Sequence, residues 1–240
     1  MKRKLMIAAV AILPLALFSC HDEFFSSITG QGEIVRQTIT TDNFDGIVSA
    51  IDADIFISQG DKTEVVIEAQ QNIIDNLDLD SAVDGILTIH YRDMVRFSKP
   101  VKIYITMPTL TKAGISGSGT MEGLTPFIDL KNLDLVISGS GAIDLDIESL
   151  ELDAVISGSG EMRLSGQTEN LNVLISGSGG FHATGLIAPK AETTISGSGN
   201  ARLTVEDQLK ALISGSGNVY YSGNPELDIH ISGSGKVVRQ

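Results

Sequence analysis

The residues with the clearest potential for chemistry are carboxylates that recur at regular spacing in the second half of the chain. Asp134, Asp153 and Glu192 occupy the same position in three repeats, with Asn172 in the repeat between them. Glu151 precedes Asp153 by two residues, so on a β-strand both side chains would point to the same face. Like charges at strand spacing repel, and hard oxygen ligands suit Ca²⁺. Asp134, Glu151 and Asp153 are therefore the candidate calcium ligands.

An acidic face that is solvated by water and screened by Lys131 and Lys210 explains the same pattern without a metal. We therefore expect no cofactor, with calcium as the alternative. The four histidines are far apart in the chain and form no zinc motif. The repeated serines have no nearby base, and nucleophile-elbow and nucleotide-binding glycine motifs are missing from the sequence. The sequence thus predicts no catalytic residues and a protein that is not an enzyme.

A repeated pentapeptide indicates which elements hold these residues. Ile-Ser-Gly-Ser-Gly occurs seven times, at intervals of 18 to 22 residues. A period near 20 is typical of a solenoid, in which each repeat covers the apolar face of its neighbour. Apolar and polar residues alternate on both sides of the pentapeptide, as in Leu133 and Leu135 before it and Ile143 and Leu145 after it. This period of two indicates β-strands rather than helices.

The pentapeptide itself predicts one corner of each coil. If the alternation continues through it, the isoleucine and both glycines point inward and both serines point into solvent. Glycine suits a bend where no side chain fits or where φ is positive. The predicted corner residues are Ser116, Gly117, Ser118, Gly119, Ser138, Gly139, Ser157, Gly158, Ser176, Gly177, Ser196, Gly197, Ser214, Gly215, Ser232 and Gly233.

The first half of the chain lacks the pentapeptide but keeps the alternation of a β protein, as in the segment from Val101 to Pro108. We interpret residues 34–113 as a more irregular β section, continuous with the solenoid and capping one end. Residues 114–240 form the repeat β-helix. A helical turn is expected only between Asn72 and Asp84. The predicted fold class is all-β, a single-chain β-helix.

The N-terminus has the pattern of a lipoprotein signal. A basic start at Lys2 to Lys4 precedes an apolar stretch that is too short to span a bilayer, so residues 1–19 are predicted to be a cleaved signal peptide. The segment Leu17 to Cys20 resembles a bacterial lipobox, in which Cys20 carries the lipid. Residues 20–33 would then form a flexible tether. We expect a lipid anchor at the cell envelope, in the outer membrane, and leave open whether the protein faces outward or the periplasm.

Charge excludes one class of partner. The net charge is −13, and it becomes −16 once the basic signal residues are removed. Nucleic-acid binding needs clustered Lys and Arg that displace counterions, so no nucleic-acid partner is expected. The same charge argues against direct adhesion of the polypeptide to an anionic lipid surface, so membrane contact is assigned to the lipid.

Several segments together resemble one bacterial family, described as putative auto-transporter adhesin, head GIN domain. They are Phe44 to Ile47, Ile55 to Gly60, Val101 to Leu110 and the Ser-Gly-Ser-Gly repeats. The resemblance covers residues 34–235 and implies a right-handed, pectin-lyase-like β-helix with the Gly-Ser-Gly segments as tight turns. It also implies a role in cell adhesion, and it supplies no catalytic residues.

The resemblance leads us to expect a non-enzymatic adhesion or interaction module that binds a protein or glycan on a host or cell surface, alone or as an oligomer. Two alternatives stay open. One is a structural envelope lipoprotein without an external ligand, and the other is a polysaccharide-active enzyme on a β-helix.

Overall fold

The computed structural model describes residues 27–83 and 85–240. The predicted signal peptide, Cys20 and the first part of the predicted tether lie outside the described residues. Of the described residues, 73% are in strands and 2% in helix, and they form a β-solenoid of about seven turns, which confirms the all-β, β-helical prediction. Within the described residues, no helix combines the length and apolar character needed to cross a bilayer.

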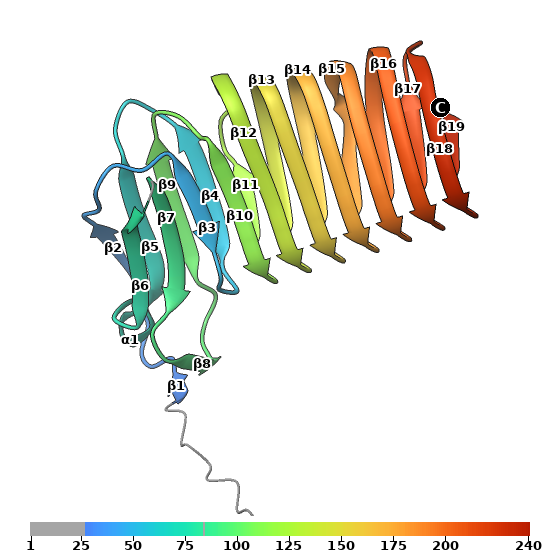
Figure 1. Cartoon of the computed structure of the whole chain (residues 1–240). Coiled ribbons are helices and arrows are strands. Elements are labelled where there is room, and N and C mark those ends of the chain that lie inside the picture. The colour runs from blue at the N-terminus through green and yellow to red at the C-terminus, as the bar shows by residue number, and fades with distance from the viewer. Residues whose placement is uncertain (1–26, 84) are drawn as a thin grey trace, which may run out of the picture.

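Each repeat forms one coil of the solenoid (Figure 1). The strands of the coils are β10 (Lys112–Gly117), β11 (Thr120–Gly123), β12 (Phe127–Gly139), β13 (Ala142–Gly158), β14 (Glu161–Gly177), β15 (Gly180–Gly197), β16 (Asn200–Gly215), β17 (Asn218–Ser222), β18 (Glu226–Gly233) and β19 (Lys236–Arg239). Neighbouring coils pair in parallel and in register, so that Ile137 lies opposite Ile156 and Ser138 opposite Ser157. The repeat in the sequence is therefore a repeat in space.

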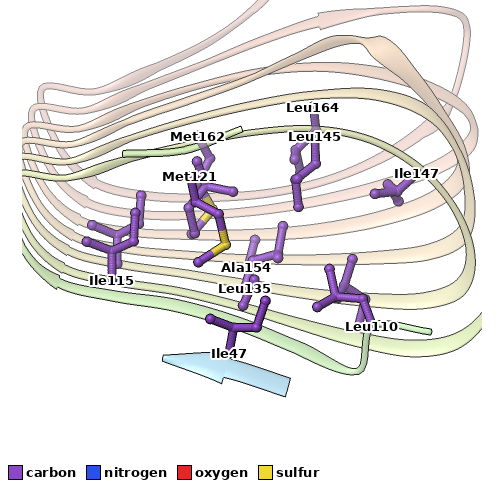
Figure 2. Close-up of a cluster of buried hydrophobic side chains, with 14 of the residues drawn as sticks. Ile47, Leu110, Ile115, Met121, Leu135, Leu145, Ile147, Ala154, Met162 and Leu164 are labelled. Atoms are coloured by element: carbon purple, nitrogen blue, oxygen red, sulfur yellow. The ribbon is translucent and has the colours of Figure 1, made fainter. Parts of the chain in front are cut away.

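The coils are flattened, with a tight corner at one edge and a wider bend at the other (Figure 2). Two walls enclose the core. The first wall consists of the segments that lead into the pentapeptide, and the second wall of the segments that follow it. Leu135 of the first wall and Leu145 of the second both point into this core, and both are almost fully buried. The predicted alternation of inward apolar and outward polar residues is confirmed in β12–β16.

The two glycines of each corner have different roles. The first, such as Gly177, has a φ of +125° and is half-buried rather than inward-facing, which corrects the simple alternation through the motif. The second, such as Gly179, is buried, and a Cβ there would lie 2.5 Å from Cγ2 of Ile156 in the preceding coil. Both serines of every corner are exposed, as expected. The corners are joined by backbone hydrogen bonds, such as Ser178 N to Gly158 O at 2.9 Å.

The N-terminal section also winds around the solenoid axis but in a different order. Its elements are β1 (Ser27–Thr29), β2 (Ile34–Ile39), β3 (Gly46–Ser49), β4 (Asp54–Gln59), β5 (Glu64–Gln70), α1 (Gln71–Ile74), β6 (Leu77–Val83), β7 (Ile86–Tyr91), β8 (Met94–Phe97) and β9 (Lys102–Met107). β3 and β4 pair with β10 and β11, whereas β7 and β9 pair on their other side. β3 and β4 thus form a first coil, and β7 and β9 form a second coil on the side of the first that faces away from the repeats. The chain then crosses back over the first coil to begin β10 on its other side.

Antiparallel strands close this end of the solenoid. β5 pairs with β9 and then with β2, and β6 pairs with β7, all antiparallel. The helix α1 occupies only residues 71–74, and β6 takes up most of the segment expected to hold a helical turn. The C-terminal end has no such cover within the described residues. Leu227, Ile229 and Ile231 of β18 are inward-pattern residues, yet they are 39–42% exposed.

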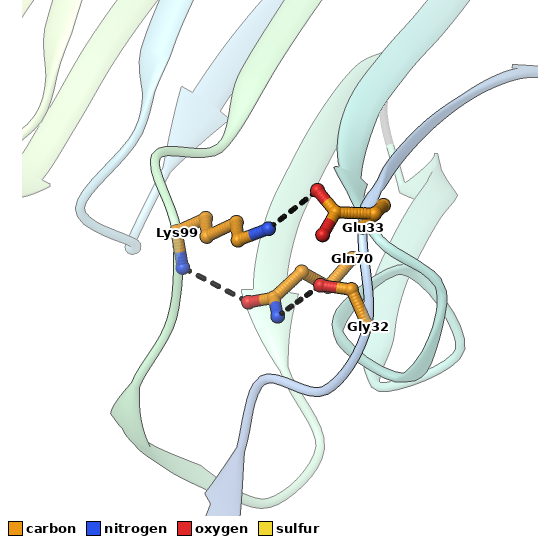
Figure 3. A network of polar contacts seen from close by, with 4 residues as sticks. All are labelled: Gly32, Glu33, Gln70 and Lys99. Carbon is orange, nitrogen blue, oxygen red and sulfur yellow. Dashed lines mark hydrogen bonds and ion pairs between the residues drawn. The ribbon is translucent and has the colours of Figure 1, made fainter.

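Polar contacts attach the start of the described chain to this capped end (Figure 3). The amide of Gln70, which is 4% exposed, donates to Gly32 O at 3.1 Å and accepts from Lys99 N at 2.9 Å. Lys99 Nζ also contacts Glu33 at 2.7 Å and lowers the pKa of that carboxyl. Residues 27–33 are therefore bound to the domain, which shortens the flexible tether that the sequence predicted for residues 20–33.

Candidate binding surface

The outward side chains of the second wall align into columns because successive coils stack in register. The central column crosses eight strands, and we call it the central ladder. Its members are, in spatial order, Tyr104, Phe56, Glu122, Asp144, Arg163, His182, Arg202 and Tyr220. All eight are exposed or half-buried. The core needs none of them, so this wall presents an ordered row of functional groups to solvent.

The ladder begins with an aromatic pair from the N-terminal section. The rings of Phe56 and Tyr104 stack with centroids 5.1 Å apart and an interplanar angle of 19°. Arg36 lies 5.4 Å from the Tyr104 ring centroid and pairs with Glu68 at 2.7 Å. Sequence analysis missed this pair because the two residues are 48 positions apart in the chain. The available signal was that each occupies the outward position of an Ile-x-Ile strand.

Charge changes sign along the ladder. Glu122 and Asp144 follow the aromatic pair, and Arg163, His182 and Arg202 come next on consecutive coils. Burial lowers the pKa of His182, and the nearby Arg202 and Arg163 lower it further, against an opposing effect of Glu161. Aromatic, acidic and basic groups thus occupy separate stretches of one flat wall.

The first wall holds the predicted calcium ligands. Asp134 lies opposite Asp153 on one side and Lys112 on the other. Asp153 Oδ1 accepts a hydrogen bond from Asn172 Nδ2 at 2.8 Å. Glu151 is in a different column, opposite Asn132. In residues 27–83 and 85–240, His, Cys, Asp and Glu side chains form no group of three or more that could hold a metal ion.

An apolar column separates these acids from the exposed corner serines. It consists of the residue before the isoleucine in five of the seven pentapeptides, a position that the sequence analysis did not consider. Its members are Val136, Val155, Leu174, Thr194 and Leu212. Leu174 is 42% exposed and the other members are half-buried. The predicted serine corners therefore border an apolar strip rather than an additional polar surface.

The amino-acid sequence matches a known family over most of the chain. Residues 43–225 match the family described as "Putative auto-transporter adhesin, head GIN domain". The chain belongs to this family. The matched region includes β3 to β17 and leaves out β1 and β2 at one end and β18 and β19 at the other.

Solved structures share the fold of this head GIN protein. A putative adhesin from Bacteroides fragilis is 23% identical, with a TM-score of 0.83 over 89% of this chain and 100% of that one. A putative adhesin from Parabacteroides merdae is 23% identical, with a TM-score of 0.77 over 89% and 99% of the two chains. A putative lipid binding protein from Parabacteroides distasonis is 24% identical, with a TM-score of 0.75 over 90% and 100%. No curated protein matches the chain.

The head GIN protein also has an acidic groove along its wider bend. The groove has a volume of about 380 Å³ and is lined by carboxylates from β12, β13, β14 and β16, namely Asp129, Glu148, Glu169 and Glu206, whereas β15 contributes Ile187 and Pro189. Lys131 is the cation among its lining residues. Paired carboxylates are the groups that glycosidases use, so this groove is the feature that most favours the enzymatic alternative.

Proposed function

We propose that this protein is a lipid-anchored, non-enzymatic adhesion or interaction module of the cell envelope. The central ladder is the observation that supports this proposal. It places aromatic, acidic and basic groups in register on an exposed wall, and the fold does not use them for its own packing. A flat, ordered surface of this kind suits a binding protein, whereas an active site concentrates its groups in a concave pocket.

The anchor is assigned to the end of the molecule opposite the last coil. Cys20 lies seven residues before β1, and β1 pairs with β8 at the capped end. The solenoid extends away from that end, so the coils of the ladder would project from the membrane (Figure 1). The contacts of Gln70 and Lys99 then connect the lipidated segment to the rigid domain. Membrane contact would come from the lipid and ligand contact from the solenoid.

The acidic groove supports the enzymatic alternative, and an activity assay separates the two. We expect the mature protein to release no reducing ends or unsaturated products from acidic polysaccharides. Robust product formation that is lost in Glu148→Gln and Glu169→Gln would replace the binding function by an enzymatic one. Lys190→Gln, on the same edge of the solenoid, provides the control for a charge change that leaves the groove carboxylates intact.

The adhesion proposal requires that the solenoid reach the cell exterior. Protease treatment of intact cells, compared with lysed cells, measures this directly, with Cys20→Ser as the unanchored control. We expect digestion on intact cells. Protection until lysis would confine the protein to the periplasm, and the structural envelope lipoprotein would then be the better description.

A further inference from the structure

A group of basic side chains interrupts the acidic surface of this protein. Arg163, His182 and Arg202 occupy one column on three consecutive coils, in a chain whose net charge is −13. At a strand spacing of about 4.8 Å, the two arginines attach to the sheet about 10 Å apart, with the imidazole between them. Arg163 pairs with Glu161. Within residues 27–83 and 85–240, Arg202 pairs with no carboxylate.

Arg202 is held in place by uncharged groups instead. Its Nη1 lies 3.4 Å from His182 Nδ1, and its guanidinium lies 5.0 Å from the ring centroid of Tyr220. Arginine can only donate hydrogen bonds, so His182 Nδ1 accepts and the imidazole is neutral in this contact. The guanidinium is thus oriented by its neighbours, while its charge is left for another partner.

The imidazole of His182 lies over Gly180 on the second wall. A Cβ on Gly180 would lie 2.8 Å from His182 Nε2, so the ring covers this glycine. Next to it, Asn218 Nδ2 donates to Asn200 Oδ1 at 3.0 Å. Each of these amides keeps further donor and acceptor capacity, which suits the hydroxyl groups of a sugar.

We propose that Arg163, His182 and Arg202 bind the carboxylate or sulfate group of an acidic sugar within a glycan, with Asn200 and Asn218 contacting its hydroxyls. This inference rests on the proposed adhesion function and names its ligand class. To bind the anion, Arg163 gives up its exposed ion pair with Glu161. The loss of this pair costs little free energy, because exposed ion pairs contribute only weakly to stability.

The rest of the ladder limits the length of the anionic segment. Asp144 and Glu122 lie on the next two coils beyond Arg163, so a continuous polyanion along the axis would meet like charge. A nucleic-acid strand is disfavoured for this reason, because its phosphates repeat along its whole length. One or two acidic groups among neutral sugars match the three coils that carry Arg163, His182 and Arg202.

Calorimetric titration of the Cys20→Ser mature protein tests the site with three probes of similar size. The probes are sialyllactose, which carries one carboxylate next to neutral sugars, sulfated lactose, which carries one sulfate, and uncharged maltotriose. We expect binding of at least one anionic probe, and comparison of the first two identifies the preferred anion. Absence of binding by both anionic probes, or equal binding of maltotriose, would overturn the inference. Tighter binding of a thymidine oligonucleotide would also overturn it.

A charge-matched pair of variants locates the site. Arg202→Gln should weaken binding of the anionic probe by about tenfold or more, because charge-assisted hydrogen bonds to the anion are lost. Lys190→Gln removes the same charge on β15 but lies outside the ladder, so its affinity should change less than about twofold. Equal effects of the two variants would overturn the inference. Thermal unfolding of both proteins verifies that they are folded.

The pKa of His182 provides a second test of the site, because it would not respond to the probe if His182 had only a structural role. Glu161, Arg163 and Arg202 are the charged groups that face it. A bound anion favours the imidazolium, so the anionic probe should raise the pKa of His182 in an NMR titration, and affinity should increase as pH falls through that pKa. His182→Gln should flatten the pH profile. An unchanged His182 pKa on saturation would contradict the assignment.

The adhesion function and this site can fail separately. If intact cells adhere to a glycan-coated surface equally well with wild-type protein and with Arg202→Gln, the adhesion function stands and this site is wrong. If the purified protein binds the anionic probe but is protected from protease on intact cells, the site stands and the adhesion function is wrong.

Discussion

The repeat coils and the N-terminal section enclose one continuous core by different means. In β12–β16 each coil lies beside the coil that precedes it in the chain, and the corner glycines recur at one edge. In the N-terminal section the strands stack out of chain order, and antiparallel strands cover the end. The comparison shows that a repeat specifies how a solenoid propagates, whereas closing its end needs a non-repeating sequence.

The corners show the same difference at the level of single residues. Gly117 is in the first corner, next to the N-terminal section, and has a φ of +126°, and no atom lies within 4 Å of the place that a Cβ would take. Gly177 has nearly the same φ, +125°, but a Cβ there would lie 2.5 Å from the carbonyl oxygen of Gly158. Backbone conformation requires glycine at both corners. Only the stacking of one glycine corner on another adds the steric requirement.

The largest effect is expected from a charge in the repeat core. Ile175 is fully buried, so Ile175→Asp places a carboxyl group among apolar side chains without a partner. We expect a loss of about 4 kcal/mol or more in the free energy of unfolding, measured by urea denaturation. Ser176→Asp, one residue later and exposed, should cost less than about 1 kcal/mol. Equal losses would contradict the inward and outward assignment of the repeat.

Substitutions of the corner glycines should give the next largest loss of stability. They compare the first corner, next to the N-terminal section, with a corner inside the repeat. Gly117→Ala should cost about 1–3 kcal/mol through its positive φ alone. Gly177→Ala should cost about 1–3 kcal/mol more, because the new methyl group also meets the Gly158 carbonyl. The free energies of unfolding of the two variants give this difference. Identical losses would show that corner stacking adds no steric requirement.

In the N-terminal section, the residue whose substitution we expect to lower stability is the buried, polar Gln70. Gln70→Ala leaves Gly32 O and Lys99 N without their partner, and we expect a loss of about 1–3 kcal/mol. Amide hydrogen exchange should show earlier opening of residues 27–33 than of β13–β16. Gln71→Ala is the control, because Gln71 is exposed and contacts other exposed side chains. Faster exchange in β13–β16 as well would mean that the two regions open as one unit.

The smallest effect is expected to be stabilising. Thr193 Oγ1 is buried without a hydrogen-bond partner among the described residues, at a position occupied by Val173 in the coil before it. Thr193→Val should therefore raise the free energy of unfolding by about 1 kcal/mol. The same substitution at Thr168 should lower it, because Thr168 Oγ1 accepts from Ser149 at 2.9 Å. Thermal unfolding of both variants measures the two signs.

Much of the solenoid could be predicted from the sequence, because each repeat is a local pattern. The inward residues from Leu133 to Val219 follow from the period of two, and the corner serines are exposed as expected. The half-buried first glycine was not predicted, because the positive φ at that residue turns the chain and interrupts the alternation. Of the candidate calcium ligands, Asp153 accepts a hydrogen bond from Asn172, a contact that the sequence did not predict.

The candidate site could be predicted only in part. Asp144, Arg163, His182 and Arg202 share a repeat position, so their column follows from the sequence. Phe56 and Tyr104 join the same column only because β4 and β9 pair on the far side of β11. That pairing depends on strands returning out of chain order, which no local pattern encodes. The contact between Arg202 and His182 depends on side-chain placement over Gly180 and Tyr220.

The amino-acid sequence by itself determined the β-helix, its coil length and its inward residues, and it predicts the lipoprotein signal. These features depend on periodicity and on short motifs, which are local. Tertiary structure decided the order of the N-terminal strands, the open last coil and the assembly of the central ladder. These depend on contacts between residues distant in the chain, whose energies arise only once the coils stack. The physical division is between interactions set by neighbours in sequence and those set by neighbours in space.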